Sequence, residues 1–265
     1  MEGQNEPLLL RHDAGGVARL TLNRPQAFNS LSQDLLTCLE QELDRIAQDP
    51  ATRVVVIAGS GKAFCAGHDL KEMGADLRDA PVRALFDQCS RMMVQLTRLP
   101  QPVIARVHGV ATAAGCQLVA ACDLAVCADD SRFAVSGVKY GLFCSTPMVA
   151  LSRNLPRKAA MEMLLTGDFI DAAQALRLGL VNEVAPPVEL DAAVDRLCAR
   201  LLDKPARVLA LGKRAFYQQL ELGLEDAYAL TTEVIVQNAL GRDFAAGLEA
   251  FTEKRKPVWP DPGEA

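Results

Sequence analysis

Two segments rich in glycine and alanine hold the clearest chemistry in this sequence. They are residues 64–70 (FCAGHDL) and 108–117 (HGVATAAGCQ), and each follows a predicted buried strand or the loop that leaves one. Small side chains leave main-chain N–H groups uncovered, and a following helix adds the positive end of its dipole. Two such segments can converge on one developing negative oxygen. Either segment alone favours the alternative, close packing of strand and helix, but the two together favour an anion-stabilising site.

The flanking sequence predicts the elements that hold these segments. Alternating apolar residues on both sides of a glycine turn predict a hairpin over 8–22, and helical spacing follows a capping box up to residue 46. The run 54–58 is short, β-branched and continuously apolar, which is typical of a strand buried on both faces. The same cycle repeats in a helix over 82–98 and in strands over 103–107 and 123–127. This order implies right-handed crossovers on a mainly parallel sheet.

After about residue 147 the strand signal nearly disappears, and helical periodicity dominates. The predicted helices span 158–165, 172–178, 189–202, 206–221, 225–239 and 243–254. The pair Pro186 and Pro187 is the best candidate for a hinge. We therefore predict an α/β core over 1–185 and a helical region over 186–265.

Composition excludes several classes of protein. A chain of 265 residues, half of them apolar, can bury one substantial core. A net charge of −5 argues against binding nucleic acid through bulk charge. The apolar stretches are far short of a membrane span, so we expect a soluble protein with neither a nucleic-acid nor a membrane partner.

Cysteine and histidine usage adds expectations about compartment and metal. The eight cysteines form no C-x-x-C pair and read as free thiols in a reducing compartment. Only three histidines are present, so we expect no metal site. The first ten residues, MEGQNEPLLL, lack the pattern of a secretory leader or a transit peptide. These features together predict a cytoplasmic protein.

The two segments and their surroundings carry a resemblance. F-x-A-G-x-D-L at 64–70, P-V-I-A-x-V at 102–107, G-x-x-x-x-x-G-C at 109–116 and L-T-G at 165–167 resemble the crotonase (enoyl-CoA hydratase/isomerase) family. The opening L-N-R-P at 22–25 and the closing F-T-E-K-R at 251–255 also fit, so the resemblance covers nearly the whole chain. The strings at 111–117, 141–147 and 255–259 look closest to the enoyl-CoA hydratase domain-containing protein 3 branch of that family.

This resemblance implies a fold, an assembly and a ligand. The expected fold is a crotonase/ClpP-like spiral of ββα units over 1–185, with 186–265 as a helical trimerisation region in a trimer or a dimer of trimers. The expected ligand is an acyl-CoA thioester, with coenzyme A as part of the substrate and no covalently bound cofactor. Motif matching places the two oxyanion-hole N–H donors at His68 and Ala114.

Further site residues carry over from the same motifs. The adenine contacts are Ala66, Asp69 and Leu70, the pantetheine wall is Ala27 and Phe28, and the phosphate cations are Arg24 and, from a neighbouring subunit, Lys254. Ser136, Cys144, Ser145, Thr146 and the His68 ring are candidates to line the acyl pocket.

The main departure from the family concerns its two catalytic glutamates. Their positions hold Gln117 and Gly137, and neither residue titrates near neutral pH. Hydration by the usual mechanism should therefore be severely impaired. We expect partial recovery in Gln117→Glu with Gly137→Glu if the backbone keeps the family geometry, and His68 with Cys144 are the first candidates to replace the missing pair.

Three functions remain open from the sequence. In the first, the chain is an acyl-CoA enzyme, hydratase- or isomerase-like, that uses an unidentified acid or base. In the second, it is a non-catalytic acyl-CoA binder or regulator of fatty-acid metabolism. The third, a structural subunit, is disfavoured because an oxyanion hole has no evident structural purpose. We favour an enzyme with weak or absent standard hydratase activity.

Overall fold

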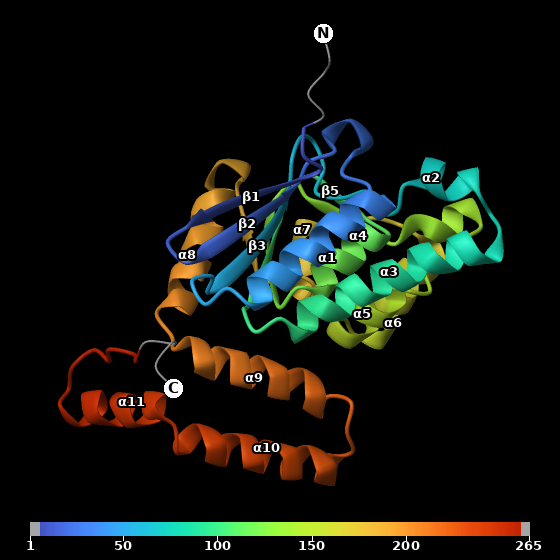
Figure 1. The fold of residues 1–265 in the computed structure, drawn as a ribbon. Helices are drawn as coiled ribbons and strands as arrows, with labels where there is room; N and C mark the ends of the chain where they lie inside the picture. The colour runs from blue at the N-terminus through green and yellow to red at the C-terminus, as the bar shows by residue number, and fades with distance from the viewer. Residues whose placement is uncertain (1–5, 261–265) are drawn as a thin grey trace.

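A six-stranded sheet forms the centre of the protein, whose computed structural model describes residues 6–260 (Figure 1). Its strands lie in the order β1-β2-β3-β4-β6-β9. The bounds are Leu9–Ala14 (β1), Val17–Leu22 (β2), Val54–Gly59 (β3), Val103–Val107 (β4), Leu124–Ala128 (β6) and Glu183–Ala185 (β9). The first two strands form an antiparallel hairpin, and every later pairing in this sheet is parallel. The predicted crossovers on a mainly parallel sheet are therefore confirmed.

A second, smaller sheet lies against the loop that follows β3. It contains β5 (Val110–Thr112), β7 (Arg132–Ala134) and β8 (Ile170–Asp171), in the order β5-β7-β8. An isolated bridge pairs Cys65 with Ala111 of β5. The small sheet therefore connects both glycine-rich segments.

Helices cover both sheets and form the C-terminal layer. Their bounds are Gln33–Ala47 (α1), Leu70–Ala75 (α2), Asp79–Arg98 (α3), Ala114–Ala121 (α4), Pro147–Asn154 (α5), Arg157–Thr166 (α6), Ala172–Leu178 (α7), Leu190–Leu202 (α8), Ala206–Gln219 (α9), Leu224–Ala239 (α10) and Arg242–Thr252 (α11). Short 3-10 turns occupy Pro25–Ala27 (η1), Ser136–Tyr140 (η2) and Pro187–Glu189 (η3). No helix within residues 6–260 is both long and apolar enough to cross a membrane.

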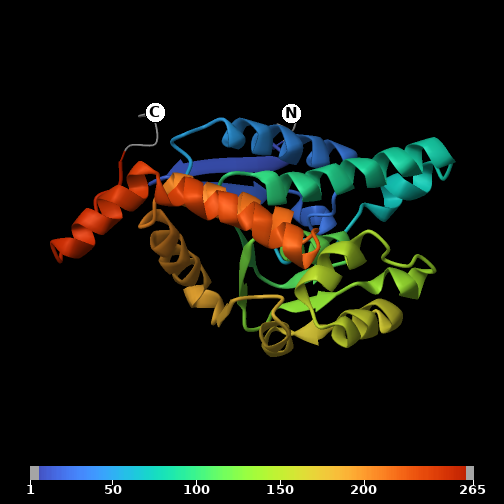
Figure 2. The same ribbon diagram turned by 90° about the horizontal axis from the view of Figure 1, so that it is seen from below.

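The large sheet is buried on both faces, as its β-branched strands require. Val55 and Ile57 of β3 point into a core shared with α1, α3 and α4, whereas Val54 and Val56 point into a second core shared with α8. Figure 2 shows α1 and α8 on opposite sides of the sheet. The side chains of β3 alternate between the two cores because successive strand residues point to opposite faces.

The last three helices, α9, α10 and α11, form a layer outside the two sheets and the helices that cover them (Figure 1). α9 packs on α3, α10 packs on α9, and α11 extends to one end of the molecule (Figure 1). α8, by contrast, belongs to the sheet, since Leu190, Ala193 and Val194 are buried against it. The change of layer therefore falls at Pro205, and not at the predicted Pro186–Pro187 hinge.

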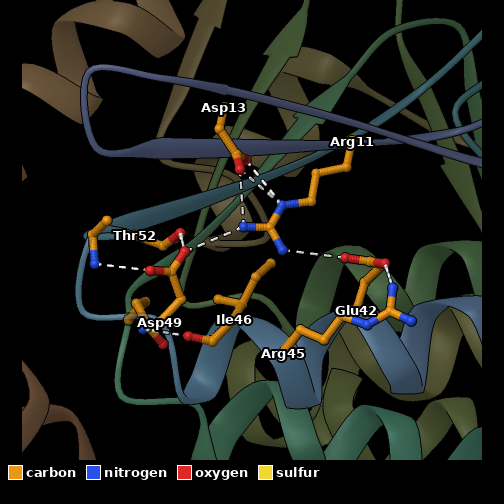
Figure 3. Close-up of polar contacts among 9 residues, drawn as sticks. Arg11, Asp13, Glu42, Arg45, Ile46, Asp49 and Thr52 are labelled. Carbon is orange, nitrogen blue, oxygen red and sulfur yellow. Dashed lines mark hydrogen bonds and ion pairs between the residues drawn. The ribbon is translucent and has the colours of Figure 1, made fainter.

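A cluster of charges ties the opening hairpin to the end of α1 (Figure 3). Arg11 on β1 donates to Glu42 at 3.2 Å, to Asp49 at 3.3 Å and to Asp13 at 3.0 Å. Asp49 in turn accepts from the Thr52 hydroxyl at 2.8 Å. These contacts hold the entry to β3 against the hairpin.

The sequence predicted the long elements and missed the short ones. The hairpin, the three central strands and the helices from α6 to α11 are confirmed within a few residues at their ends. The strands β5, β7, β8 and β9 have only two or three residues each, which is too short for a periodic signal. α5 was also missed, although Pro147 occupies its first turn, where proline is favoured.

Candidate active site

Main-chain hydrogen bonds join the two glycine-rich segments side by side. The Cys65 N–H donates to the carbonyl of Val110 at 3.2 Å, and the Thr112 N–H donates to the carbonyl of Cys65 at 3.0 Å. The Thr112 hydroxyl donates to the Ala66 carbonyl, also at 3.0 Å. The convergence of the segments predicted from the sequence is therefore observed.

Two glycines allow the close approach of these backbones. A Cβ on Gly115, in the first turn of α4, would lie 2.1 Å from the Cys65 carbonyl oxygen. A Cβ on Gly67 would lie 2.9 Å from the Ala113 Cβ and 3.3 Å from the Ala114 nitrogen. Gly67 also has φ +92°, which disfavours other residues. The contact places the Ala114 nitrogen beside the peptide that precedes His68.

The main-chain N–H groups of His68 and Ala114 have no hydrogen-bond acceptor among the described residues. Ala114 is the first residue of α4, so its N–H is one of the donors that a helix leaves unpaired, and it lies at the positive end of the helix dipole. The preceding residue, Ala113, has φ 48° and ψ −119°, an unfavourable conformation for alanine. This pair of donors can stabilise a negative oxygen.

The His68 side chain is packed and electrically neutral. Both ring nitrogens are buried without a partner in hydrogen-bond geometry in residues 6–260, and the ring meets Phe86 of α3 edge-on at a centroid distance of 5.1 Å. Burial lowers the pKa of His68 to about 4, and a contact with the main chain of Leu31 opposes this shift only in part. His68 is therefore neutral at pH 7 and a weak base. The sequence carried no signal for the contact with Phe86.

Gln117 lies one turn after Ala114 on α4. Its side chain is 4% exposed, and its Oε1 is buried without a hydrogen-bond partner in the described chain. An amide cannot transfer a proton as a carboxylic acid does, but it can hold a polar group by hydrogen bonding.

Gly137 lies in η2 with no room for a side chain. A Cβ there would lie 2.4 Å from the Leu142 carbonyl oxygen and 2.8 Å from the Cys144 Sγ. The Gly137 carbonyl also accepts from the Leu142 N–H at 3.0 Å, which closes the loop over this position. A glutamate at 137 would require the loop to move, so the recovery expected from Gln117→Glu with Gly137→Glu has no support in this geometry.

The remaining polar candidates supply no acid or base. Cys144 is buried, which raises the pKa of its thiol above the ordinary value and keeps it protonated. Ser145 is exposed, and its hydroxyl donates to the Phe143 carbonyl at 3.4 Å. With the pKa of His68 lowered to about 4 and that of Cys144 raised, this pair is poorly suited to replace the missing glutamates at pH 7.

The predicted coenzyme A residues gather at the turn between β2 and α1. The Ala66 N–H donates to the Phe28 carbonyl at 3.0 Å, and Ala27 precedes Phe28 at the end of η1. Phe28 and Leu70 are 55% and 54% exposed, which leaves two large apolar side chains at the surface of this region. Apolar groups of this kind suit an adenine ring or a pantetheine chain.

Arg24 has a structural partner. Its guanidinium donates to Asp69 at 2.9 Å and to the Ser30 carbonyl at 2.6 Å, and both members of the ion pair are largely buried. Asp69 also caps α2 by accepting from the Lys71 and Glu72 N–H groups. The pair braces the loop that carries His68, and it leaves fewer guanidinium donors for a phosphate.

Lys254 is exposed and follows α11, at the far end of the molecule from α2 (Figure 1). The described chain therefore does not bring Lys254 to the other site residues within one subunit (Figure 1).

A cavity of about 440 Å³ lies elsewhere, at the carboxyl ends of β3, β4 and β6, where Arg106 and His108 line it. Arg106 is paired with Asp191 at 2.7 Å, and His108 contacts the Gly61 carbonyl at 2.9 Å. Arg106 and His108 are thus engaged by the protein itself, whereas the main-chain donors of His68 and Ala114 are not, and we take these donors as the candidate site. Residues 6–260 contain no group of three or more His, Cys, Asp or Glu side chains able to hold a metal ion.

A parallel sheet with a helical C-terminal layer, and two unpaired main-chain donors at the start of a buried helix, define an α/β protein of the crotonase type. The family model for enoyl-CoA hydratase/isomerase matches residues 12–262, and the chain belongs to this family. The family uses CoA thioester substrates without a required cofactor, and membership indicates an enzyme-like activity.

Individual relatives confirm the predicted branch. Enoyl-CoA hydratase domain-containing protein 3 of Xenopus laevis is 46% identical over 256 residues, covering 97% of this chain and 87% of the relative. The structure of human enoyl coenzyme A hydratase domain-containing protein 3 is 42% identical with TM-score 0.91, covering 96% of this chain and all of the other. An enoyl-CoA hydratase structure from Mycobacterium smegmatis is 53% identical with TM-score 0.94, covering 96% and 99% of the two chains.

The names of these relatives contradict the predicted cytoplasmic localisation. The frog, rat and human proteins are all named as mitochondrial. The prediction was wrong because reduced cysteines exclude oxidising compartments but do not distinguish one reducing compartment from another. We predicted that residues 1–10 carry no leader, and residues 1–5 lie outside the described part of the chain.

Proposed function

We propose that this protein binds an acyl-CoA thioester and polarises its carbonyl group between the main-chain N–H groups of His68 and Ala114. The observation that carries the proposal is the pair of unpaired donors, which lie on segments packed so closely that a Cβ on Gly67 would come within 3.3 Å of the Ala114 nitrogen. Donors fixed by the fold need no reorganisation when negative charge develops on the oxygen, and one such donor contributes about 3–4 kcal/mol in a measured case.

The coenzyme A portion then lies across the exposed apolar residues of the neighbouring turn. Leu70 and Ala66 face the adenine of the nucleotide, and Phe28 and Ala27 form the wall beside the pantetheine chain. Lys254 of a neighbouring subunit supplies positive charge for the phosphates. No covalently bound cofactor takes part in this proposal.

The chemistry of the site is limited by its lack of a proton-transfer group. Gln117 and Gly137 cannot titrate, the pKa of His68 is about 4, and burial holds the Cys144 thiol protonated. The site therefore stabilises an enolate without supplying the acid and base that hydration needs. The protein therefore either hydrates its ligand slowly or binds acyl-CoA without turnover, as a sensor.

Self-association through the C-terminal helices is part of the same proposal. α9, α10 and α11 expose large apolar side chains that a single chain leaves uncovered, namely Phe216, Leu220, Leu224, Tyr228, Ile235, Leu240, Phe244 and Phe251. Many large apolar side chains exposed along three consecutive helices are typical of a subunit interface. We expect a trimer or a dimer of trimers in light scattering, and a stable monomer at micromolar concentration would contradict this part.

Calorimetry with a matched pair of ligands tests the function. Butyryl-CoA carries the carbonyl oxygen, whereas S-butyl-CoA, its thioether analogue, lacks it and keeps the rest of the molecule. We expect butyryl-CoA to bind about tenfold or more tightly, since two hydrogen bonds are lost in the analogue. Absence of heat with butyryl-CoA at millimolar concentration, or equal affinity for the two ligands, would contradict the proposal.

A further inference from the structure

The guanidinium of Arg24 contacts both sides of a main-chain bridge that includes His68. Its Nη1 donates to the Ser30 carbonyl at 2.6 Å, and its Nη2 donates to the Asp69 carboxylate at 2.9 Å. Leu31, which follows Ser30, pairs with His68, which precedes Asp69, in an isolated parallel bridge. The side chains of Arg24 and Asp69 are only 17% and 15% exposed. This ion pair therefore closes around the loop that carries one of the two proposed donors.

The bridge fixes the direction of the His68 N–H. The Leu31 N–H donates to the Gly67 carbonyl at 2.7 Å, and the Asp69 N–H donates to the Leu31 carbonyl at 3.2 Å. No peptide bond in residues 6–260 is cis, and the carbonyl and N–H of a planar trans peptide point in opposite directions. Because the Gly67 carbonyl points toward Leu31, the His68 N–H of the same peptide points away from Leu31. The donor is therefore turned out of the bridge and is available to a ligand.

Arg24 orients the bridge through a second peptide. The Ser30 carbonyl and the Leu31 N–H belong to one trans peptide, so a guanidinium that holds the carbonyl directs the N–H to the opposite side. That N–H is the group that holds the loop before His68. Two trans peptides in series therefore connect the Arg24 guanidinium to the direction of the His68 N–H.

Asp69 holds the other side of the donor. Its carboxylate accepts from Arg24 and also from the main-chain N–H groups of Lys71 and Glu72, where it caps α2. The hydrogen bond from Arg24, followed by those main-chain bonds, keeps the pKa of Asp69 below its ordinary value, so the carboxylate is charged at neutral pH. The planar guanidinium holds this carboxylate and a carbonyl in fixed directions at the same time, which a single ammonium group does less well.

We propose that Arg24 and Asp69 are positioning residues of the oxyanion hole, which hold the His68 N–H in the direction of the thioester oxygen. This inference rests on the proposed function, since it assumes that a thioester carbonyl accepts from His68. The sequence predicted Arg24 as a cation for the coenzyme A phosphates, but both of its terminal nitrogens are engaged within the chain.

A positioning role and a phosphate-binding role predict different ligand dependences. Butyryl-CoA and S-butyl-CoA carry the same phosphates, and only the thioester has the carbonyl oxygen. If Arg24 positions a donor, its replacement weakens binding of the thioester alone. If Arg24 binds phosphate, its replacement weakens binding of both ligands by the same factor. Lysine at position 24 is informative because it keeps the positive charge and lacks the planar fork.

Calorimetry with both ligands on Arg24→Lys tests the inference. The preference for butyryl-CoA should fall from about tenfold or more in the wild type to about threefold or less, with the affinity for S-butyl-CoA changed by less than about twofold. Asp69→Asn keeps a side chain that can cap α2 and should lower the preference in the same direction. The matched control is Arg106→Lys, since Arg106 forks onto Asp191 at 2.7 and 3.1 Å, and its replacement should leave the preference unchanged.

The outcomes separate this inference from the function on which it rests. Equal binding of butyryl-CoA and S-butyl-CoA by the wild type would overturn the proposed function, and this inference with it. A wild-type preference that persists in Arg24→Lys, or in Asp69→Asn if only that variant folds, would overturn this inference alone. An equal loss of affinity for both ligands in Arg24→Lys would also overturn it and would assign Arg24 to the phosphates.

Discussion

The cluster of Asp123, Lys213 and Tyr217 and the site around His68 both bury polar groups, but only the cluster pairs its side chains within the chain. Lys213 of α9 donates to the carbonyls of Leu96 and Gln101 at 2.8 and 2.9 Å, and it lies 2.7 Å from Asp123. Asp123 also accepts from the Tyr217 hydroxyl at 2.9 Å. These polar groups are paired with one another, and the pairing holds α9 to the sheet.

The site around His68 has the opposite arrangement. Its two main-chain donors, its imidazole and the Gln117 Oε1 face no partner within the described chain. An unpaired buried polar group costs about 1–3 kcal/mol, so the fold tolerates this site at the expense of stability. The difference teaches that the charged groups of a structural cluster are paired within the chain, whereas the groups around His68 are left for the proposed ligand to pair. Unpaired buried atoms at Arg53, Ser60 and Gln101 show that a missing partner alone does not mark a site.

The largest expected effect concerns hydration of crotonyl-CoA. Each missing acid–base group typically costs a factor of about 10²–10⁴, so the wild-type rate should lie about 10⁴-fold or more below that of a two-glutamate hydratase assayed in parallel. Gln117→Glu should raise the rate, because position 117 already accommodates a side chain of that size. Adding Gly137→Glu should bring no further gain and should lower stability, because the Leu142 carbonyl occupies the required space. A wild-type rate typical of a good hydratase would show that another acid and base act in the site.

Breaking the paired cluster should cost the most stability. Lys213→Met leaves the Asp123 carboxylate buried without its charge partner, and removal of one member of a buried ion pair costs about 3–5 kcal/mol. Chemical denaturation measures the change. The matched control is Lys204→Met, which removes an exposed pair with Asp203 and should change the free energy of unfolding by less than about 1 kcal/mol. Equal effects of the two variants would show that the Asp123 cluster is no more important than a surface pair.

Separating the two donor segments should weaken both folding and binding. Gly67→Ala places a Cβ 2.9 Å from the Ala113 Cβ, at a backbone φ that alanine disfavours, so we expect a loss of about 2–4 kcal/mol of stability and weaker butyryl-CoA binding. Gly212→Ala is the control, since its Cβ meets nothing within 4 Å on α9 and alanine favours the helix by about 0.5–1 kcal/mol. Unchanged thioester binding in a folded Gly67→Ala protein would argue against the placement of the site.

The unpaired histidine predicts a pH dependence of stability. The pKa of His68 is about 4 in the folded protein, below its ordinary value of about 6.5, so the unfolded chain binds the proton more readily. Stability from this group is fully present above pH 6.5 and is lost as the pH falls toward 4, with a loss of about 2 kcal/mol at pH 5. Denaturation at pH 7 and pH 5 should show this loss in the wild type and a smaller one in His68→Phe. An identical loss in the variant would assign the effect to other groups.

The sequence predicted this site only in outline, for reasons that are physical. Glycine and alanine around His68 and Ala114 signal exposed N–H groups, because small side chains can be recognised from sequence alone. The closed loop at Gly137 depends on how Leu142 and Cys144 return to it, which no local pattern encodes. The contact between Phe86 of α3 and the His68 ring joins segments that are separate in the sequence, so it could not be predicted from a local pattern either.

The fold shows the same division. Strands such as β3 and helices such as α1 have enough residues to display a period, and they were predicted correctly. The three-residue strands β5 and β9 form only because neighbouring strands offer partners. The placement of α8 on the sheet likewise depends on the core around Val194, which the predicted boundary at 186 could not take into account.

Difference infrared spectroscopy of bound butyryl-CoA, labelled with ¹³C at the thioester carbonyl, tests the central claim most directly. Two donors from His68 and Ala114 should move the carbonyl stretch of the bound ligand to a lower frequency than in water. In Gly67→Ala, whose added Cβ would push apart the two segments that carry the donors, the shift should be smaller. A carbonyl frequency for the bound ligand equal to that in water would contradict the account.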